Sequence, residues 1–280
     1  MTARLTEVER DGLVLDVLDE GPIDGDPVVL LHGFPERLTS WRHVTPLLHE
    51  AGLRTIAVDQ RGFSPKARPK GRRAYAAQHF AADALAVIDA VGGRAHLVGH
   101  DWGSATAWAA AVMAPEKVAS LTAISVPHPG AFMRSMIGTR QILKSWYMAM
   151  FNVPRVPEML AKRRGGYFDA RLRAFGMTPD DIERFHTEIE EYGALPGGLG
   201  WYRALPFAER GLLGRTVRVP TTLLWSDGDV AIDRASVDAT ADWVEADYEL
   251  VVLPGVSHWI PVHAPHETAT AVLRRIERSR

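Results

Sequence analysis

Apolar and polar positions alternate along the chain in blocks, and the blocks predict an α/β fold. Short continuous apolar runs bounded by Gly, Pro or Asp are typical of strands buried on both faces of a parallel sheet. Longer stretches with helical spacing follow these runs through residues 27–127 and again from Thr221 onward. This order favours a mostly parallel, doubly wound sheet. After a hairpin at 4–20, we expect strands at 28–31, 55–58, 95–98, 118–125, 221–225 and 248–253. We expect helices at 40–49 (capped by Ser40), at 75–91, after the third of these strands and ending near 113, at 233–243 and at 264–277.

Residues 128–212 break this alternation. They contain no clear buried strand, and their amphipathic stretches are separated by Gly and Pro, as at Gly165-Gly166 and Pro196-Gly197-Gly198. We expect a helical cap inserted after the sixth strand, between a first part of the core at 1–127 and a second part at 213–280. Such an insert can lie over the carboxyl ends of the strands, where open α/β sheets bind their ligands.

Composition narrows the possible partners. The 280 residues carry a formal charge of −2 and no Cys, so we expect neither nucleic acid nor a membrane as partner, no disulfide and no thiol chemistry. The first residues lack an apolar signal core, and no apolar run is long enough to span a bilayer. The expectation is a cytoplasmic protein that is monomeric or homodimeric.

The segment Gly99-His100-Asp101-Trp102-Gly103 stands between an expected buried strand and an Ala-rich helix start. It has the form of a nucleophile elbow, Gly-x-Ser-x-Gly, with Asp in the place of Ser. The glycines lack the Cβ atoms that would clash where the strand passes into the helix, and N–H groups at the helix start favour negative charge on Asp101. Ser104 is the competing nucleophile, but its place just past the elbow predicts a packing or capping role.

A nucleophile of this kind needs a histidine base and an acid that orients the histidine, in the chain order nucleophile, acid, histidine. Asp229 and His258 each follow an expected strand, as Asp101 does, so all three can meet at one edge of the sheet. Asp227 stays open as the alternative to Asp229. The other competing residues are Asp233 for the acid, and His263 and His266 for the histidine.

The loop His32-Gly33-Phe34-Pro35 follows the strand after which this fold places its oxyanion loop. We expect the backbone N–H groups of Phe34 and Trp102 to form a two-donor oxyanion hole. A plain strand-to-helix turn would also suit Gly33 and Pro35. The sequence carries no metal-binding motif, so we expect neither a metal nor another cofactor.

Aspartate at the elbow changes the chemistry that is expected. A carboxylate attacks saturated carbon and displaces a leaving group, which gives an alkyl ester that His258 and water can hydrolyse. Epoxides and alkyl halides both suit this reaction, but an epoxide oxygen also needs a proton. A tyrosine can donate one, and residues 128–212 offer Tyr147 and Tyr202, although most such tyrosines only pack.

With these motifs the chain resembles the soluble-type epoxide hydrolases of the α/β-hydrolase fold superfamily, over essentially its whole length. The resemblance implies that Asp101 is the nucleophile, His258 the base and Asp229 its orienting acid. It also implies that Tyr147 and Tyr202 protonate the epoxide oxygen, so that a small apolar epoxide and water give a vicinal diol. The matching segments are residues 32–36, 40–42, 59–62, 99–103, 126–129, 146–151, 201–203, 227–229 and 257–259.

Related families differ from this chain at two positions. Haloalkane dehalogenases typically carry Asn where this chain has Phe34, and fluoroacetate dehalogenases carry Arg where it has Trp102. We therefore prefer the epoxide reaction, with haloalkane dehalogenation and a non-catalytic ligand-binding protein as the alternatives. Ser257 is a minor departure from the resemblance, because the family usually has Gly before the histidine. The expected apolar substrate pocket comprises His32, Pro35, Trp146, Met150, Phe151 and Trp259.

Overall fold

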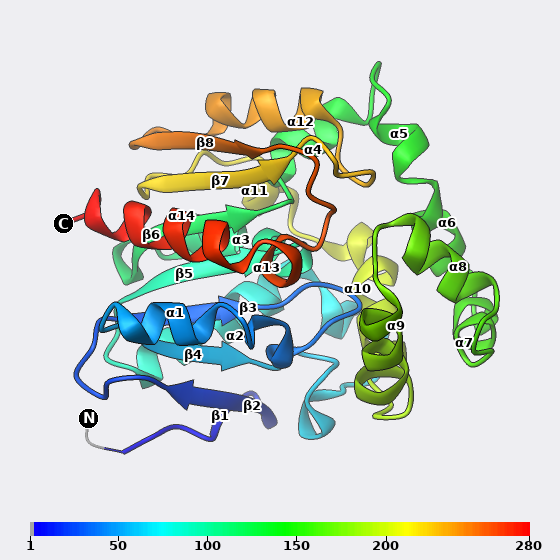
Figure 1. Ribbon diagram of the computed structural model, residues 1–280, viewed down its shortest axis with the longest axis horizontal. Coiled ribbons are helices and arrows are strands. Elements are labelled where there is room, and N and C mark those ends of the chain that lie inside the picture. The colour runs from blue at the N-terminus through cyan, green and yellow to red at the C-terminus, as the bar shows by residue number, and fades with distance from the viewer. Residues whose placement is uncertain (1–2) are drawn as a thin grey trace.

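The computed structural model describes residues 3–280, apart from the side chains at positions 210 and 213. Its centre is an eight-stranded sheet in the order β1-β2-β4-β3-β5-β6-β7-β8 (Figure 1). β1 and β2 form the predicted hairpin and are antiparallel to their neighbours, whereas the strands from β4 across to β8 are parallel to one another. The strands are β1 (Glu7–Arg10), β2 (Leu13–Glu20), β3 (Pro27–Leu31), β4 (Arg54–Val58), β5 (Ala95–His100), β6 (Val118–Ile124), β7 (Thr221–Ser226) and β8 (Tyr248–Leu253).

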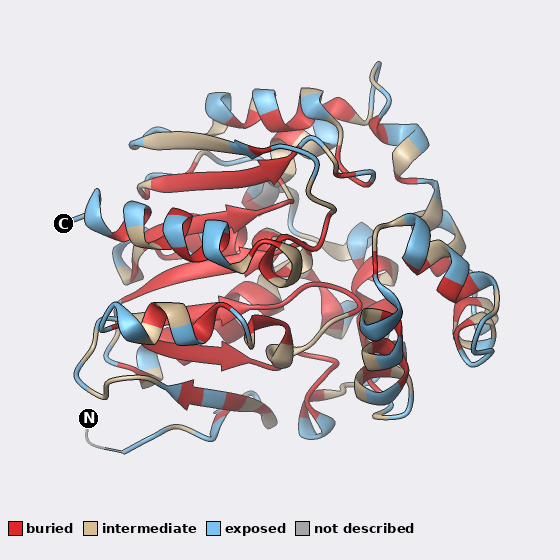
Figure 2. Cartoon of the chain, viewed as in Figure 1, coloured by how far each residue is buried: buried red, intermediate tan, exposed pale blue. Residues whose placement is uncertain are grey.

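Helices cover both faces of the sheet, as predicted. α1 (Thr45–Glu50) and α14 (Pro265–Glu277) pass in front of it in Figure 1, and α2 (Ala77–Ala90) and α3 (Trp102–Met113) lie behind it. The central strands β4, β5 and β7 are buried along their whole length (Figure 2), which explains their continuous apolar runs. The second part of the core adds α12 (Arg234–Asp238), the 3-10 helix Ala239–Trp243 and α13 (Ile260–His263).

The helix predicted at 40–49 begins later than expected. Ser40 is not its N-cap, because this residue lies buried inside the 3-10 helix Leu38–Trp41, and its hydroxyl has no hydrogen-bond partner among the described residues. α1 begins only at Thr45. Pro46 accounts for the later start, since a proline ring fits the first turn of a helix, where its missing N–H needs no partner.

The chain between β6 and β7 contains helices and, within the described residues, no strand. Figure 1 shows α5 to α10 beyond the carboxyl ends of the strands, where their side chains share an aromatic cluster with residues of the core such as Phe34, Phe63 and Trp259. α4 instead packs against the sheet's helices, because Gly130 lies against the ring of Trp243, which also stacks on His128. The helices are α4 (Pro129–Ser135), α5 (Gln141–Lys144), α6 (Trp146–Phe151), α7 (Val156–Ala161), α8 (Tyr167–Ala174), α9 (Pro179–Phe185), the π-helix His186–Glu190, α10 (Leu195–Arg203), the 3-10 helix Leu205–Phe207 and α11 (Arg210–Leu213).

Candidate active site

β5 ends in a sharp backbone turn that presents Asp101 at the carboxyl edge of the sheet. Asp101 has φ 52° and ψ −117°, a conformation that residues with a Cβ rarely adopt, and α3 begins at the next residue. Neighbouring glycines make room for this turn. A Cβ on Gly99 would lie 2.2 Å from the carbonyl oxygen of Gly103, and a Cβ on Gly33 would lie 2.5 Å from the Cβ of Asp101. The predicted sequence of strand, turn and helix start is confirmed.

Gly103 gives a direct test of this packing. A Cβ at this position would lie 2.0 Å from the carbonyl oxygen of Leu31 in β3, where the backbone cannot move aside. Gly103→Ala should therefore lower the free energy of unfolding by about 3 kcal/mol, measured by urea denaturation. Gly211→Ala in α11 is the control, because no described atom lies within 4 Å of a Cβ at that position and alanine favours a helix. Equal unfolding midpoints for Gly103→Ala and the unchanged protein would contradict the close approach of β3.

The carboxylate of Asp101 is held between Phe34 and His258. The backbone N–H of Phe34 donates to Oδ1 of Asp101 at 2.8 Å, and Nε2 of His258 lies 3.4 Å from Oδ2. Two N–H groups are predicted to form the oxyanion hole. The N–H of Phe34 donates to the carboxylate of Asp101 itself. The other belongs to Trp102, the first residue of α3. The two oxygens of Asp101 are therefore in different environments.

His258 is oriented by Asp229. Its Nδ1 lies 2.7 Å from Oδ2 of Asp229, which leaves Nε2 facing Asp101. The other oxygen of Asp229 accepts hydrogen bonds from the backbone N–H groups of Ala231 and Ile232, at 2.7 and 3.0 Å. These bonds fix the carboxylate, so His258 donates its Nδ1–H to Asp229 and holds one ring orientation.

The charges of these three side chains are coupled. Burial alone would lower the pKa of His258, but the carboxylates of Asp229 and Asp101 outweigh burial and raise the pKa to about 10. Burial likewise opposes ionisation of Asp101, yet His258 and the N–H of Phe34 hold the pKa of that carboxyl below its usual value. Near neutral pH the site therefore contains an imidazolium between two carboxylates.

The competing residues bond elsewhere. Asp227 accepts a hydrogen bond from the N–H of Gly255, and Asp233 caps α12. His263 bonds Ser257 and Asp181, whereas His266 is exposed on α14. Ser104 donates to the carbonyl oxygen of Val126. Among these candidates in the described chain, Asp229 and His258 are the pair that the structure brings to Asp101. The choice between Asp227 and Asp229, which the sequence leaves open, falls geometrically on Asp229.

Tyr147 of α6 and Tyr202 of α10 lie next to each other, with ring centroids 6.1 Å apart. Tyr202 packs edge-to-face on Phe34 and Trp102, at 5.3 and 4.9 Å, and Phe151 packs against both tyrosines. Tyr202 thus lies against the loop and the elbow that hold the nucleophile candidate, and Tyr147 lies beside Tyr202. Burial raises the pKa of both hydroxyls, and the negative charge below them adds to the effect, so both stay protonated.

Comparison with known proteins identifies the family of the chain. Residues 26–154 match the family described as alpha/beta hydrolase fold. The chain is 31% identical over 270 residues to epoxide hydrolase 4 of Mus musculus, which covers 92% of this chain and 75% of the relative. The chain belongs to the epoxide hydrolases of the α/β-hydrolase superfamily.

Other epoxide hydrolases extend the match over nearly the whole length of the chain. Epoxide hydrolase A of Mycobacterium tuberculosis is 28% identical over 309 residues, with 95% of each chain covered. A solved structure from work on epoxide hydrolases in metagenomes from hot environments superposes with a TM-score of 0.84, at 27% identity and 99% coverage of both chains. The similarity therefore includes the helices between β6 and β7 as well as the sheet.

Two residues expected in the pocket of this epoxide hydrolase lie elsewhere. Trp146 is 42% exposed, and the guanidinium of Arg171 lies 5.0 Å above its ring. α6 accounts for this position, because a helix that turns Tyr147 and Phe151 inward turns the residue before Tyr147 outward. His32 is completely buried and supports the loops, since its Nδ1 bonds the carbonyl oxygen of Gly33 and its Nε2 accepts the N–H of Gln60.

The remaining expected pocket residues lie beside the central side chains. Phe151 contacts both tyrosines, Trp259 packs against His258 with ring centroids 5.2 Å apart, Met150 is half-buried against the aromatic core, and Pro35 is buried next to Phe34. In the described part of the chain, no group of three or more His, Cys, Asp or Glu side chains could hold a metal ion.

Sequence reasoning gave no role to Glu36 and His100, which form a second layer behind His258. His100 Nε2 donates to the carbonyl oxygen of His258 at 2.9 Å, and the Ser125 hydroxyl donates to the same oxygen at 2.8 Å. Oε2 of Glu36 lies 3.2 Å from Nδ1 of His100. Glu36 directly follows Pro35 and His100 directly precedes Asp101, so both lie inside the matching segments 32–36 and 99–103. That position is the signal in the sequence that could have indicated a role for them.

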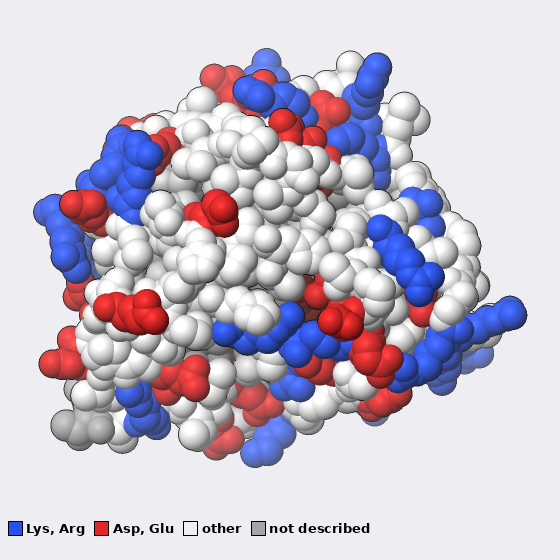
Figure 3. Space-filling model, in the orientation of Figure 1, with Lys and Arg blue, Asp and Glu red and all other residues white. Residues whose placement is uncertain are grey.

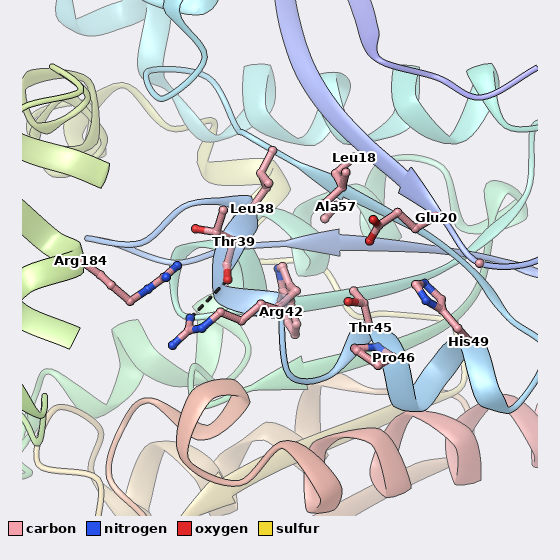
Figure 4. A pocket seen from close by; sticks show the side chains of 12 residues that line it. Leu18, Glu20, Leu38, Thr39, Arg42, Thr45, Pro46, His49, Ala57 and Arg184 are labelled. Atoms are coloured by element: carbon pink, nitrogen blue, oxygen red, sulfur yellow. Dashed lines mark hydrogen bonds between the residues drawn. The ribbon is translucent and has the colours of Figure 1, made fainter. Parts of the chain in front are cut away.

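A hollow of about 610 Å³ lies away from these residues, between β2, α1 and the segment before α1. Figure 4 shows Leu18 and Ala57 among the residues that line it, and Arg42, whose guanidinium donates to the carbonyl oxygen of Thr39. None of the residues that line it belongs to the triad or the tyrosine pair. It is therefore separate from the candidate active site.

Proposed function

We propose that this epoxide hydrolase converts a small apolar epoxide into a vicinal diol through an alkyl ester on Asp101. The observation that carries the proposal is the chain Asp101–His258–Asp229 beneath buried Tyr202 and half-buried Tyr147. Residues 128–212 then act as the cap that holds the tyrosines over the core formed by 1–127 and 213–280. The reaction needs water as second substrate and no cofactor.

The first step is attack by the carboxylate on a ring carbon. Oδ1 of Asp101 stays bound to the N–H of Phe34, so Oδ2 is the oxygen that forms the new C–O bond. The C–O bond of the ring breaks, and Tyr147 or Tyr202 gives its hydroxyl proton to the departing oxygen. This step leaves a neutral ester, an alcohol and a tyrosinate.

Ester formation also prepares His258 to act as a base. It removes the charge of Asp101, one of the two carboxylates that raise the histidine pKa. The imidazolium then returns a proton to the tyrosinate and becomes neutral. A base is therefore available only when there is an ester to hydrolyse.

The second step is hydrolysis of the ester. Nε2 of His258 takes a proton from water, which attacks the ester carbonyl of Asp101, and the N–H groups of Phe34 and Trp102 stabilise the oxyanion. Collapse releases the diol and restores the carboxylate, the imidazolium and both phenols. Protons and charges balance over the cycle.

A substrate panel tests the proposed function. One preparation should be assayed with terminal, internal and aryl epoxides, haloalkanes and p-nitrophenyl esters. We expect diol formation from at least one class of epoxide. Release of halide with no opening of any epoxide would overturn the proposal in favour of a dehalogenase, and no turnover with bound ligand would favour a binding protein.

The role of Asp229 predicts a difference between two similar substitutions. Asp229→Asn should slow ester hydrolysis by about 10³-fold or more, because His258 loses the partner that fixes its tautomer and stabilises its positive charge. Asp227→Asn is the matched control and should change the rate little, since this carboxylate bonds Gly255. Single-turnover kinetics separates the hydrolysis step, and the reverse order of effects would move the role to Asp227.

The histidine pKa predicts how stability changes with pH. Because the folded value of about 10 lies above the ordinary 6.5, charged His258 stabilises the fold fully below about pH 6.5. This contribution declines as the pH rises toward 10. The free energy of unfolding of the unchanged protein minus that of His258→Gln should therefore be largest near pH 6 and smallest near pH 10. Urea denaturation at several pH values measures the difference, and a constant difference would contradict the raised pKa.

A further inference from the structure

The net charge of the chain hides an uneven distribution. Residues 129–174 contain nine Lys and Arg but only two acidic residues, although the whole chain has a formal charge of −2. Both acidic side chains are already paired within the fold. Glu158 bonds Arg203 at 2.8 Å, and buried Asp169 bonds His186 at 3.0 Å. The surface of this segment is therefore strongly cationic.

Most of these cations have no carboxylate partner. Arg164 pairs with Glu183 and Glu191, and Arg134 approaches Asp242 at 3.8 Å. Among the described residues, the other seven have no acidic group within ion-pair distance: Arg140, Lys144, Arg155, Lys162, Arg163, Arg171 and Arg173. Figure 3 shows Lys and Arg along the right-hand margin, where Figure 1 places α5 to α8.

Large apolar side chains are exposed on the same segment. Of the thirteen that are exposed in the described chain, eight fall between Met133 and Tyr167. Ile137 is 84% and Leu143 73% exposed, and exposed apolar side chains that gather among polar ones mark an interaction surface. We call this set, together with the cations, the outer ridge. Its apolar members are Met133, Ile137, Ile142, Leu143, Trp146, Val153, Met159 and Tyr167.

Where it runs over α6, the outer ridge lies directly outside the candidate active site. α6 carries Tyr147 and Phe151 on its inner side, next to Tyr202, and exposes Trp146 on its outer side. A single layer of helix thus separates the ridge from the tyrosine pair. An apolar molecule dissolved in a lipid phase would meet the protein at this face.

We infer that the outer ridge docks on the surface of a membrane that contains anionic phospholipids. Exposed aliphatic and aromatic side chains among Lys and Arg are the combination that binds at the interface of such bilayers, where the cations meet the headgroups and the apolar groups enter the acyl boundary. No described helix is long and apolar enough to cross a membrane, so the contact is peripheral. This inference replaces the expectation, drawn from net charge, of no membrane partner.

Charge and side-chain type favour a membrane over other occupants. A second copy bound symmetrically through this face would bring two cationic surfaces together, which is unfavourable. Six of the eight apolar side chains of the ridge are not aromatic and offer no stacking surface for nucleic-acid bases; the two aromatic ones are Trp146 and Tyr167. An anionic bilayer complements both the charges and the apolar groups.

Vesicle co-sedimentation tests the inference. The full chain is mixed at low salt with vesicles of phosphatidylcholine containing about one quarter phosphatidylserine, and with vesicles of phosphatidylcholine alone. We expect sedimentation with the anionic vesicles, weakened by added salt. Lys162→Glu with Arg163→Glu should weaken binding by about fivefold or more for each position, and Ile137→Asp with Leu143→Asp should also release the protein.

Matched controls separate this inference from the proposed function. Lys66→Glu with Lys70→Glu reverses two charges outside the ridge and should bind as the unchanged protein does. Turnover of a water-soluble epoxide should be unchanged in all of these variants, so binding is scored independently of catalysis. The inference would be overturned by equal affinity for both vesicle types or by no sedimentation at all. It would also be overturned if sedimentation velocity found a dimer that the ridge substitutions dissociate.

Discussion

Replacing His258 by Gln should leave an alkyl ester on Asp101 that can be isolated. Glutamine cannot accept a proton from water, so ester hydrolysis should slow by about 10²–10⁴-fold, whereas attack by the carboxylate needs no base. After mixing with an epoxide, mass spectrometry should find one added epoxide mass on the peptide that contains residues 99–103. The adduct should form within the time of a single turnover.

Asp101→Asn in the same background is the control, because an amide is a far poorer nucleophile than a carboxylate. It should carry no adduct. An adduct on Ser104 would move the nucleophile by three residues. Full turnover by His258→Gln would remove the histidine from the reaction altogether.

The double substitution Tyr147→Phe with Tyr202→Phe should abolish nearly all ring opening. Without a donor the epoxide oxygen must leave as an alkoxide, and a general acid typically contributes about 10²–10⁴-fold. Either single Phe variant should keep reduced activity, because the other hydroxyl remains. The loss should fall on the alkylation step and appear as a missing burst in single-turnover kinetics.

The size of the rings is unchanged in these variants, so packing around Phe34 and Phe151 should survive. Unfolding midpoints close to the unchanged value would verify this. If the double variant still opens epoxides at nearly the unchanged rate, the two-tyrosine mechanism is wrong, while the role of Asp101 stands.

The sheet could be predicted from the sequence because burial on both faces leaves a direct pattern. β4, β5 and β7 are short apolar runs between turn residues, and each was located to within a residue or two. Helix starts were harder, because several residues can cap a helix. Ser40 has the right chemistry for a cap, but Pro46 sets the start of α1.

The central site residues could be predicted because chain order and strand ends restrict where they stand. Asp101, Asp229 and His258 each follow a strand, and the structure brings them into one chain of contacts. Which of the two carboxylates contacts His258 required coordinates, since Asp227 and Asp229 share one loop. The two aspartates differ in that the N–H groups of Ala231 and Ile232 hold the carboxylate of Asp229.

The surroundings of the site depend on packing that the sequence does not display. Trp146 and Tyr147 are adjacent, and only the rotation of α6 determines which of them faces inward. The contact between Glu36 and His100 joins residues that are far apart in the chain. The excess of Lys and Arg in residues 129–174 can be read from the sequence, but which of these cations lack a carboxylate partner required coordinates.

The most direct test of the mechanism is a single turnover in water labelled with oxygen-18, with the protein in excess over the epoxide. If water attacks the ester carbonyl of Asp101, the label enters the carboxylate of that residue, and the diol takes its new oxygen unlabelled from the protein. Mass spectrometry of the peptide containing residues 99–103 and of the diol measures both. Label in the diol with an unlabelled Asp101 would mean that water opens the epoxide directly, and would contradict the account.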